Sequence, residues 1–147
     1  MRVSFGGVVL LLALTLSVGP AEARDTQYKL KIAEVLNNPA FKPKLGDDVA
    51  FYFGNQKSAA VAESYGEWVT NRKTNSAGKA DEEACRWAML SALVELRERA
   101  KKLNANAVTN IVSYYKKNTF SSDAEYECHA GAVVAGVALK GTVVKLK

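Results

Sequence analysis

The residues of this chain that could carry out nucleophilic, redox or metal chemistry are few. The sequence holds one histidine, His129, and two cysteines, Cys85 and Cys128. Any Ser–His or Cys–His mechanism must therefore use His129. Glu125 and Glu127 would share one face of a strand and could act as a carboxylate pair, although alternating charges are more typical of a solvated strand face. Because the sequence also lacks the Gly-x-Ser-x-Gly nucleophile motif, we expect no enzyme active site.

The first 23 residues have the organisation of a secretory signal peptide. Arg2 supplies a positive charge, residues 8–18 are almost wholly apolar, and small residues precede a cleavage site after Ala23. An uncleaved anchor is the alternative, but the apolar run is short for a membrane span of about 20 residues. We expect a mature single domain of residues 24–147, without a transmembrane segment, in the periplasm or secreted.

Export makes the cysteines informative. An even number of cysteines in an oxidising compartment favours one internal disulfide, Cys85–Cys128. The pair would close a loop of about 43 residues and stabilise the fold by about 4 kcal/mol. Two separate buried thiols are the alternative, and a redox-active pair would need a Cys-x-x-Cys spacing. Cys128 and His129 are neighbours that would point to opposite faces of a strand, so we expect no metal and no cofactor.

Length and composition limit the class of protein. The 147 residues are 48% hydrophobic and 24% charged, which suits one domain with a single core and excludes a two-domain enzyme or a wholly disordered chain. Lys and Arg exceed Asp and Glu by 20 to 15, a net charge of +5. This excess is compatible with binding of anionic polymers but is too small to identify them.

One long helix is the clearest element. From Asp81 to Leu103, apolar residues recur every three or four positions, acidic residues stand at the start and lysines at the end. Strands are predicted at Tyr28–Ile32, Val49–Phe53, Tyr65–Thr70, Ala107–Tyr115 and once or twice within Tyr126–Lys147. The type of element near Ile32 stays open, since helical spacing also fits there. One helical turn is expected at Phe41–Leu45, a connection at Gln56–Ser64, and loops at Asn71–Lys79 and Lys116–Asp123. These elements predict an α+β fold, a small mixed sheet of four to five strands with the helix packed across it.

Basic and aromatic residues predict a candidate patch for an anionic ligand. Cations beside rings can bind nucleic acid, lipopolysaccharide or teichoic-type chains. The candidate residues are Tyr114, Tyr115, Lys116 and Lys117, with Arg72 and Lys73 from another predicted loop. In the alternative interpretation the tyrosines pair across the sheet and the lysines keep a strand edge soluble.

Several short motifs resemble one family. They are Gly66-Glu67-Trp68-Val69, the Ala-rich helix, Ala105-Asn106-Ala107-Val108 and Gly141-Thr142-Val143-Val144. From Tyr65 to its C-terminus the chain resembles the YbjQ/RcsF-like proteins, small α+β domains that include a ring-forming group and an envelope stress-sensing lipoprotein. Unlike that lipoprotein, this chain has no lipidation cysteine and only two cysteines. The resemblance implies the α+β fold and a binding role in the envelope, linked to stress and self-assembly.

Exported chains similar to this one are often labelled excinuclease ATPase subunits, a label that the residues do not support. A phosphate-binding loop needs two glycines separated by four residues and then Lys and Ser or Thr. The nearest match, Gly131 to Gly136, is followed by Val137 and Ala138. We therefore expect no ATP as a ligand. Genomic DNA lies outside the predicted compartment, so we do not expect nucleic acid either.

Three functions remain open from the sequence. The first is a non-enzymatic envelope interaction module that binds another envelope protein or itself, and an exposed sheet edge over a filled core would favour it. The second is a periplasmic enzyme acting on envelope material through His129 and Glu127, which a cleft with converging polar groups would favour. The third is an anionic-polymer-binding protein that uses the Tyr114–Lys117 tract.

Overall fold

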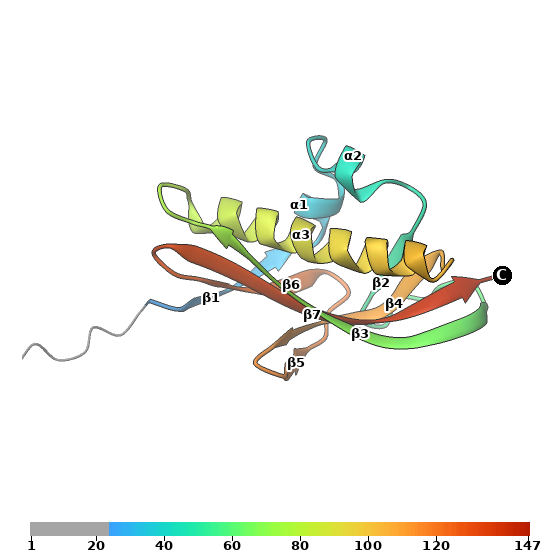
Figure 1. Ribbon diagram of the computed structural model, residues 1–147. Helices are drawn as coiled ribbons and strands as arrows, with labels where there is room; N and C mark the ends of the chain where they lie inside the picture. The colour runs from blue at the N-terminus through green and yellow to red at the C-terminus, as the bar shows by residue number, and fades with distance from the viewer. Residues whose placement is uncertain (1–23) are drawn as a thin grey trace, which may run out of the picture.

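The computed structural model describes residues 24–147, in which one long helix lies across a curled mixed sheet (Figure 1). The signal peptide predicted at residues 1–23 lies outside the described residues. The elements follow the order β1 (Thr26–Lys31), α1 (Ala33–Leu36), α2 (Lys42–Leu45), β2 (Ala50–Phe53), β3 (Val61–Asn75), α3 (Asp81–Lys102), β4 (Ala107–Tyr115), β5 (Asn118–Phe120), β6 (Glu125–Ala130) and β7 (Val134–Leu146). The predicted α+β class, long helix and small mixed sheet are confirmed.

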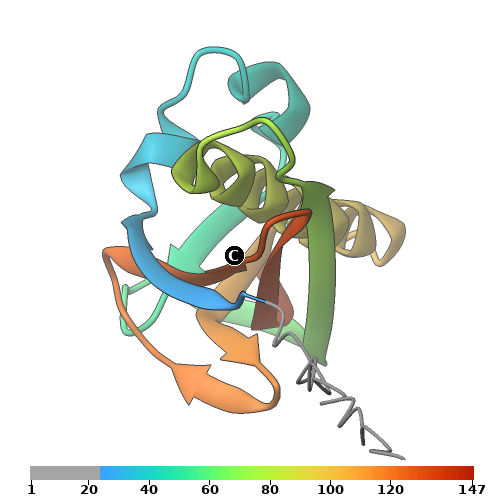
Figure 2. The same cartoon turned by 90° about the vertical axis from the view of Figure 1, so that its left-hand side faces the viewer.

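The sheet is organised around β7. Its main strand order is β1-β6-β7-β4-β2, in which only β2 and β4 run parallel. β3 pairs with β7 from residue 134 to residue 146, whereas the opposite edge of β7 is shared by β6 at residues 135–136 and by β4 at residues 139–144. β5 continues from β4 as a hairpin on the side of the sheet away from α3 (Figures 1 and 2). The sheet curls where β6 and β4 diverge from the edge of β7 that they share, and we call this place the fork between β4 and β6.

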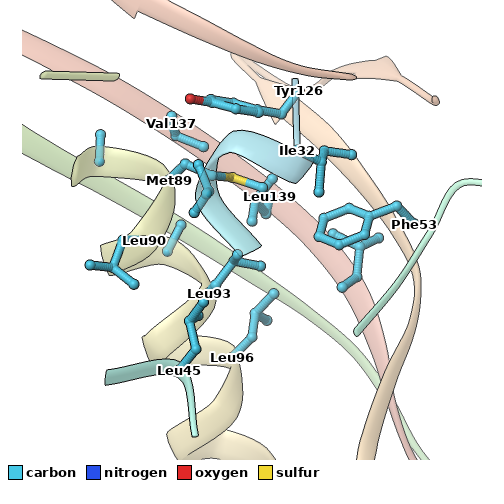
Figure 3. Close-up of a cluster of buried hydrophobic side chains, with 14 of the residues drawn as sticks. Ile32, Leu45, Phe53, Met89, Leu90, Leu93, Leu96, Tyr126, Val137 and Leu139 are labelled. Carbon is cyan, nitrogen blue, oxygen red and sulfur yellow. The ribbon is translucent and has the colours of Figure 1, made fainter. Parts of the chain in front are cut away.

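The core lies between α3 and the sheet. Alanines at 84, 88, 92 and 100 of α3 are fully buried, and their small side chains let the helix approach the strands closely. Figure 3 shows larger α3 side chains, Met89 and Leu93 among them, gathered against Tyr126 and Leu139 of the sheet. α1 and α2 close one end of this layer with Val35, Phe41 and Leu45. The interior of the described domain is thus filled by side chains.

Several predicted boundaries are wrong. The connection expected at Gln56–Ser64 is already strand from Val61 onward, and the loop expected at Asn71–Lys79 is strand as far as Asn75. Both belong to β3, whose side chains are mostly exposed and therefore lack the apolar alternation of a half-buried strand. The loop expected at Lys116–Asp123 contains β5, and the open choice near Ile32 is resolved as a strand followed by a short helix.

Candidate functional site

The disulfide between Cys85 and Cys128 is present and joins α3 to β6. The Cα atoms of the two residues lie 5.9 Å apart, and both side chains are fully buried. Because both sulfur atoms are bonded to each other, neither is a nucleophile or a metal ligand. The bond faces Cys128 toward α3, so that its neighbour His129 points to the opposite, outer face of the sheet.

His129 lies in a compact polar cluster on this outer face. Its Nδ1 is 3.0 Å from Oδ1 of Asp25, and its Nε2 is 2.6 Å from Oε1 of Glu127. The ring of Tyr115 stacks on the imidazole with the ring centroids 3.4 Å apart, and its hydroxyl donates to Asp25 Oδ2 at 3.2 Å. The structure therefore joins His129 and Glu127 with two residues that sequence reasoning had not placed beside them.

The hydrogen bonds in the cluster restrict what His129 can do. Each imidazole nitrogen lies within hydrogen-bonding distance of a carboxylate of the same chain, so a substrate could reach either nitrogen only by displacing Asp25 or Glu127. Burial, followed by the charge of Asp25, raises the pKa of the Tyr115 phenol, which keeps it a hydrogen-bond donor at neutral pH. The cluster ties β4, β6 and the segment before β1 together.

The acidic residues of β6 face lysines rather than each other. In the register of β1 and β6, Glu127 lies opposite Lys29 and Glu125 opposite Lys31. The backbone N–H of Glu127 donates to Ser113 Oγ across the fork between β6 and β4. Opposite charges at facing positions stabilise an antiparallel pair, and here they account for the alternating charges of this strand.

The segment before β1 is anchored on both faces of the sheet. Arg24 forms two hydrogen bonds to Asp81 at the start of α3, with an Nη1 to Oδ2 distance of 2.6 Å, and donates to the carbonyl of Gly131. Tyr28 donates to the same carboxylate at 2.8 Å. The hydrogen bond from Arg24, and then that from Tyr28, lower the pKa of Asp81 to about 2. Asp25, the next residue, reaches the His129 cluster on the other face.

The predicted Tyr114–Lys117 tract is divided between two roles. Lys140 Nζ lies 4.4 Å from the ring centroid of Tyr114, while Tyr115 stacks on His129, so both tyrosines have partners within the fold. Lys116 and Lys117 form the exposed two-residue turn between β4 and β5, with φ angles of 49° and 64°. Left-handed backbone is costly for a residue with a Cβ, and Asn-Gly is the sequence such turns prefer.

Arg72 and Lys73 do not form one patch with this tract. They are neighbours on β3 and point to opposite faces: the guanidinium of Arg72 pairs with Glu95 of α3. Lys73 lies on the outer face, opposite Gly136 of β7, which in turn lies opposite His129. The prediction of both residues in a loop was wrong because Asn71–Asn75 belong to a strand, and only Lys73 shares the face of His129.

The outer edge of β3 is the feature that sequence reasoning missed. Glu67 to Asn75 run in unbroken register with β7, and no strand among the described residues pairs with the opposite edge. The side chain of Val69 is 55% exposed at the middle of this edge. The signal for it lay in the residue types, since Trp, Val, Thr and Tyr are strand formers even where polar residues interrupt them.

A hollow of about 740 Å³ lies along α3 beside this edge. Its lining includes Arg72, Trp87 and Arg99, and the guanidinium of Arg99 lies over the ring of Trp68 at 4.1 Å. Trp87 is itself held by Phe41, with 4.8 Å between the ring centroids. The lining belongs mainly to α3, carries charged groups of both signs, and reaches β3 through Arg72.

No protein family model, curated protein or solved structure matches this chain. None of the described helices is both long and apolar enough to span a membrane. Residues 24–147 contain no cluster of three or more His, Cys, Asp or Glu side chains arranged to hold a metal ion. The geometry of the site is therefore the basis for assigning a function.

Proposed function

We propose that this chain is an exported, non-enzymatic interaction module of the bacterial envelope that binds a partner protein along the outer edge of β3. The observation that carries the proposal is this open edge over a filled core. An edge strand presents backbone N–H and C=O groups that pair readily with another extended segment. β3 has 15 residues, which is long for a strand. Its outer edge is open in the folded chain, so a partner can pair with it without any element unfolding.

The His129 cluster supports a non-enzymatic role. Converging polar groups surround the imidazole, yet both of its nitrogens are bound to carboxylates of this same chain. The hydrogen-bonding side chains around it are Asp25, Glu127 and Tyr115, and no serine or thiol nucleophile touches it in the described domain. An acyl-transfer site needs a nucleophile that is hydrogen-bonded to its base. This arrangement instead suits a structural role, in which the cluster holds neighbouring segments together.

The location in the envelope rests on two supports. The buried disulfide fits an oxidising compartment, as predicted from the export signal. The resemblance to the YbjQ/RcsF-like proteins implies a role for this chain in the envelope and in its stress response. A periplasmic protein that binds an envelope partner through a strand edge is consistent with both.

A second candidate function, binding of anionic polymer, is favoured by the turn between β4 and β5. Lys116 and Lys117 both hold left-handed backbone there, although Gly or Asn would relieve the strain. Strained residues at exposed tips often serve a ligand. This candidate requires affinity for a polyanion that falls steeply as salt rises, and salt-independent binding would exclude it.

Site-specific photo-crosslinking in cells that export the chain tests the two surfaces together. A photoreactive amino acid is placed at Val69 on the β3 edge or at Lys117 on the hairpin turn, both exposed. We expect a protein adduct from Val69 and none from Lys117. Adducts from Lys117 alone would favour the hairpin surface, and an absence of adducts from Val69 would contradict the proposed function.

A further inference from the structure

Resting on the proposed function, we infer that the partner of β3 is a second copy of this chain, paired antiparallel about Thr70. The two copies would form one continuous sheet through their β3 edges. An interface of this kind has two-fold symmetry and closes after two copies, so it yields a dimer and not a fibre. Two independent features of β3 support it.

The first feature is the distribution of charge along the edge. On the outer face of β3, the N-terminal half carries Glu67 and the C-terminal half carries Lys73. Arg72 faces the other way and pairs with Glu95 of α3. Antiparallel pairing of two such strands places the acidic half of each copy against the basic half of the other. Facing opposite charges stabilise a strand pair, whereas parallel pairing in register would put like charges together.

The register follows from the regular part of the strand. The pairing of β3 with β7 shifts between Ser64 and Glu67 and is unbroken from there to Asn75. Self-pairing centred on Thr70 uses only this unbroken part and places Glu67 of each copy opposite Lys73 of the other. Both side chains are exposed and lie on the outer face, because positions an even number of residues apart share a face.

The second feature is a set of unsatisfied buried polar atoms. Three buried side-chain atoms in the described residues lack a hydrogen-bond partner, and two of them, Thr70 Oγ1 and Trp68 Nε1, belong to the centre of β3. Thr70 is only 3% exposed. In the proposed register the two Thr70 residues face each other across the two-fold axis, and rotation of each enclosed hydroxyl toward the edge lets one donate to the other. A second copy thus supplies a partner that this chain does not.

The same pairing covers apolar surface. Val69, exposed at the edge, would lie opposite Asn71 of the other copy and be shielded by the neighbouring strand. The hollow beside α3, with Arg72 and Arg99 in its lining, would become part of a groove between the two helical layers. The edge is therefore complementary to itself in charge and hydrogen bonding.

Charge exchange between copies tests this inference. The purified exported protein is examined by sedimentation velocity as wild type, Glu67→Lys, Lys73→Glu and an equimolar mixture of the two variants. We expect a wild-type dimer, a dimer about tenfold or more weaker for each variant alone, and a restored mixed dimer in the mixture. Recovery in the mixture shows that both variants are folded. Asp47→Lys and Lys79→Glu change the same charges in exposed turns and should leave the dimer intact.

A further variant separates a role in the interface from a role in folding. Thr70→Val removes the hydroxyl at the axis while keeping a β-branched side chain. Because the hydroxyl lacks a partner in the single chain, we expect the monomer to unfold at the same or a higher denaturant concentration while the dimer weakens.

A wild type that stays monomeric at every concentration, or a mixture that restores nothing, would overturn the inference. If the wild type is monomeric but Val69 crosslinks to a different protein, the proposed function stands and the second copy fails. If Val69 yields no adduct, both fail.

Discussion

β3 and β7 are neighbours of similar length in one sheet, yet they differ in almost everything that surrounds them. β7 has strands on both edges and α3 above it, and Ala135, Val137, Leu139 and Val143 are buried in the core. β3 has β7 on one edge and no strand of the described residues on the other, and only Thr70 among its residues is buried. The fold therefore depends on β7, whereas β3 presents a surface.

The sequence differences match these surroundings. β7 is apolar and includes Gly141, where an added Cβ would lie 2.7 Å from a methyl group of Val108. β3 mixes strand-forming residues with charged ones, and only Thr70 on its inner face is fully buried. Charged residues on an edge usually discourage unwanted pairing, but the opposite charges of the two halves of β3 leave antiparallel self-pairing allowed. Edge changes should thus alter association, and core changes should alter stability.

The largest effect is expected from removing the disulfide that joins α3 to β6. Replacing Cys85 and Cys128 together by Ala should lower the free energy of unfolding by about 4 kcal/mol. The cause is the larger conformational freedom of the unfolded chain, since the bond links residues separated by 43 positions. Chemical denaturation measures the loss. A loss below about 1 kcal/mol would show that the α3–β6 layer does not depend on its crosslink.

The second effect compares the two strands directly. Leu139→Ala in β7 removes a fully buried side chain and should cost about 3 kcal/mol. Val69→Ala at the exposed edge of β3 should change the free energy of unfolding by no more than about 0.5 kcal/mol. Equilibrium unfolding in urea measures both variants. Equal losses of unfolding free energy in the two variants would contradict the conclusion that β7 belongs to the core and β3 to the surface.

The contrast also explains what the sequence could predict. The helix at Asp81–Lys102 is recognisable because its apolar spacing, terminal charges and length all agree, and the disulfide was predicted from an even cysteine count in a chain expected to be exported. β3 was predicted to end at Thr70 because Asn71, Arg72 and Lys73 resemble loop residues. An edge strand with few buried side chains has no periodic apolar signal to extend it.

The His129 cluster was less accessible to sequence reasoning. That Cys128 and His129 face opposite ways follows from strand geometry alone. The contacts of His129 with Asp25 and Tyr115 depend on the fork between β4 and β6 and on the segment before β1, at separations of up to 104 positions in sequence. No local sequence pattern predicts contacts between residues so far apart. The facing of Glu125 and Glu127 to lysines, in contrast, follows from the register of β1 and β6 alone.

A third, smaller effect is expected at the turn between β4 and β5, which belongs to neither β3 nor β7. Lys116→Asn with Lys117→Gly should raise the free energy of unfolding by about 1 kcal/mol, because both positions have left-handed backbone. Lys116→Gln with Lys117→Gln removes the same charges and leaves the backbone strain, so it should not stabilise. Thermal unfolding compares the pairs. If both pairs weaken binding of a polyanion, the lysine charges are part of a binding surface; if neither does, the turn serves no such ligand.

The smallest effect should appear at low pH in the ion pair that joins the N-terminal segment to α3. The hydrogen bonds from Arg24 and Tyr28 lower the pKa of Asp81 from an ordinary value of 3.8 to about 2. A group with a lowered pKa in the folded state stabilises the protein above its unfolded pKa and loses that contribution as the pH falls through the folded value. The stability from Asp81 should therefore be intact above pH 4 and decline between about pH 4 and pH 2.

Asp81→Asn should remove this pH-dependent component, whereas Glu82→Gln, a change in the same helical turn, should retain it. Urea unfolding at a series of pH values gives both curves. Identical acid profiles for the wild type and Asp81→Asn would show that the segment before β1 is held by the His129 cluster and the strand pairing alone.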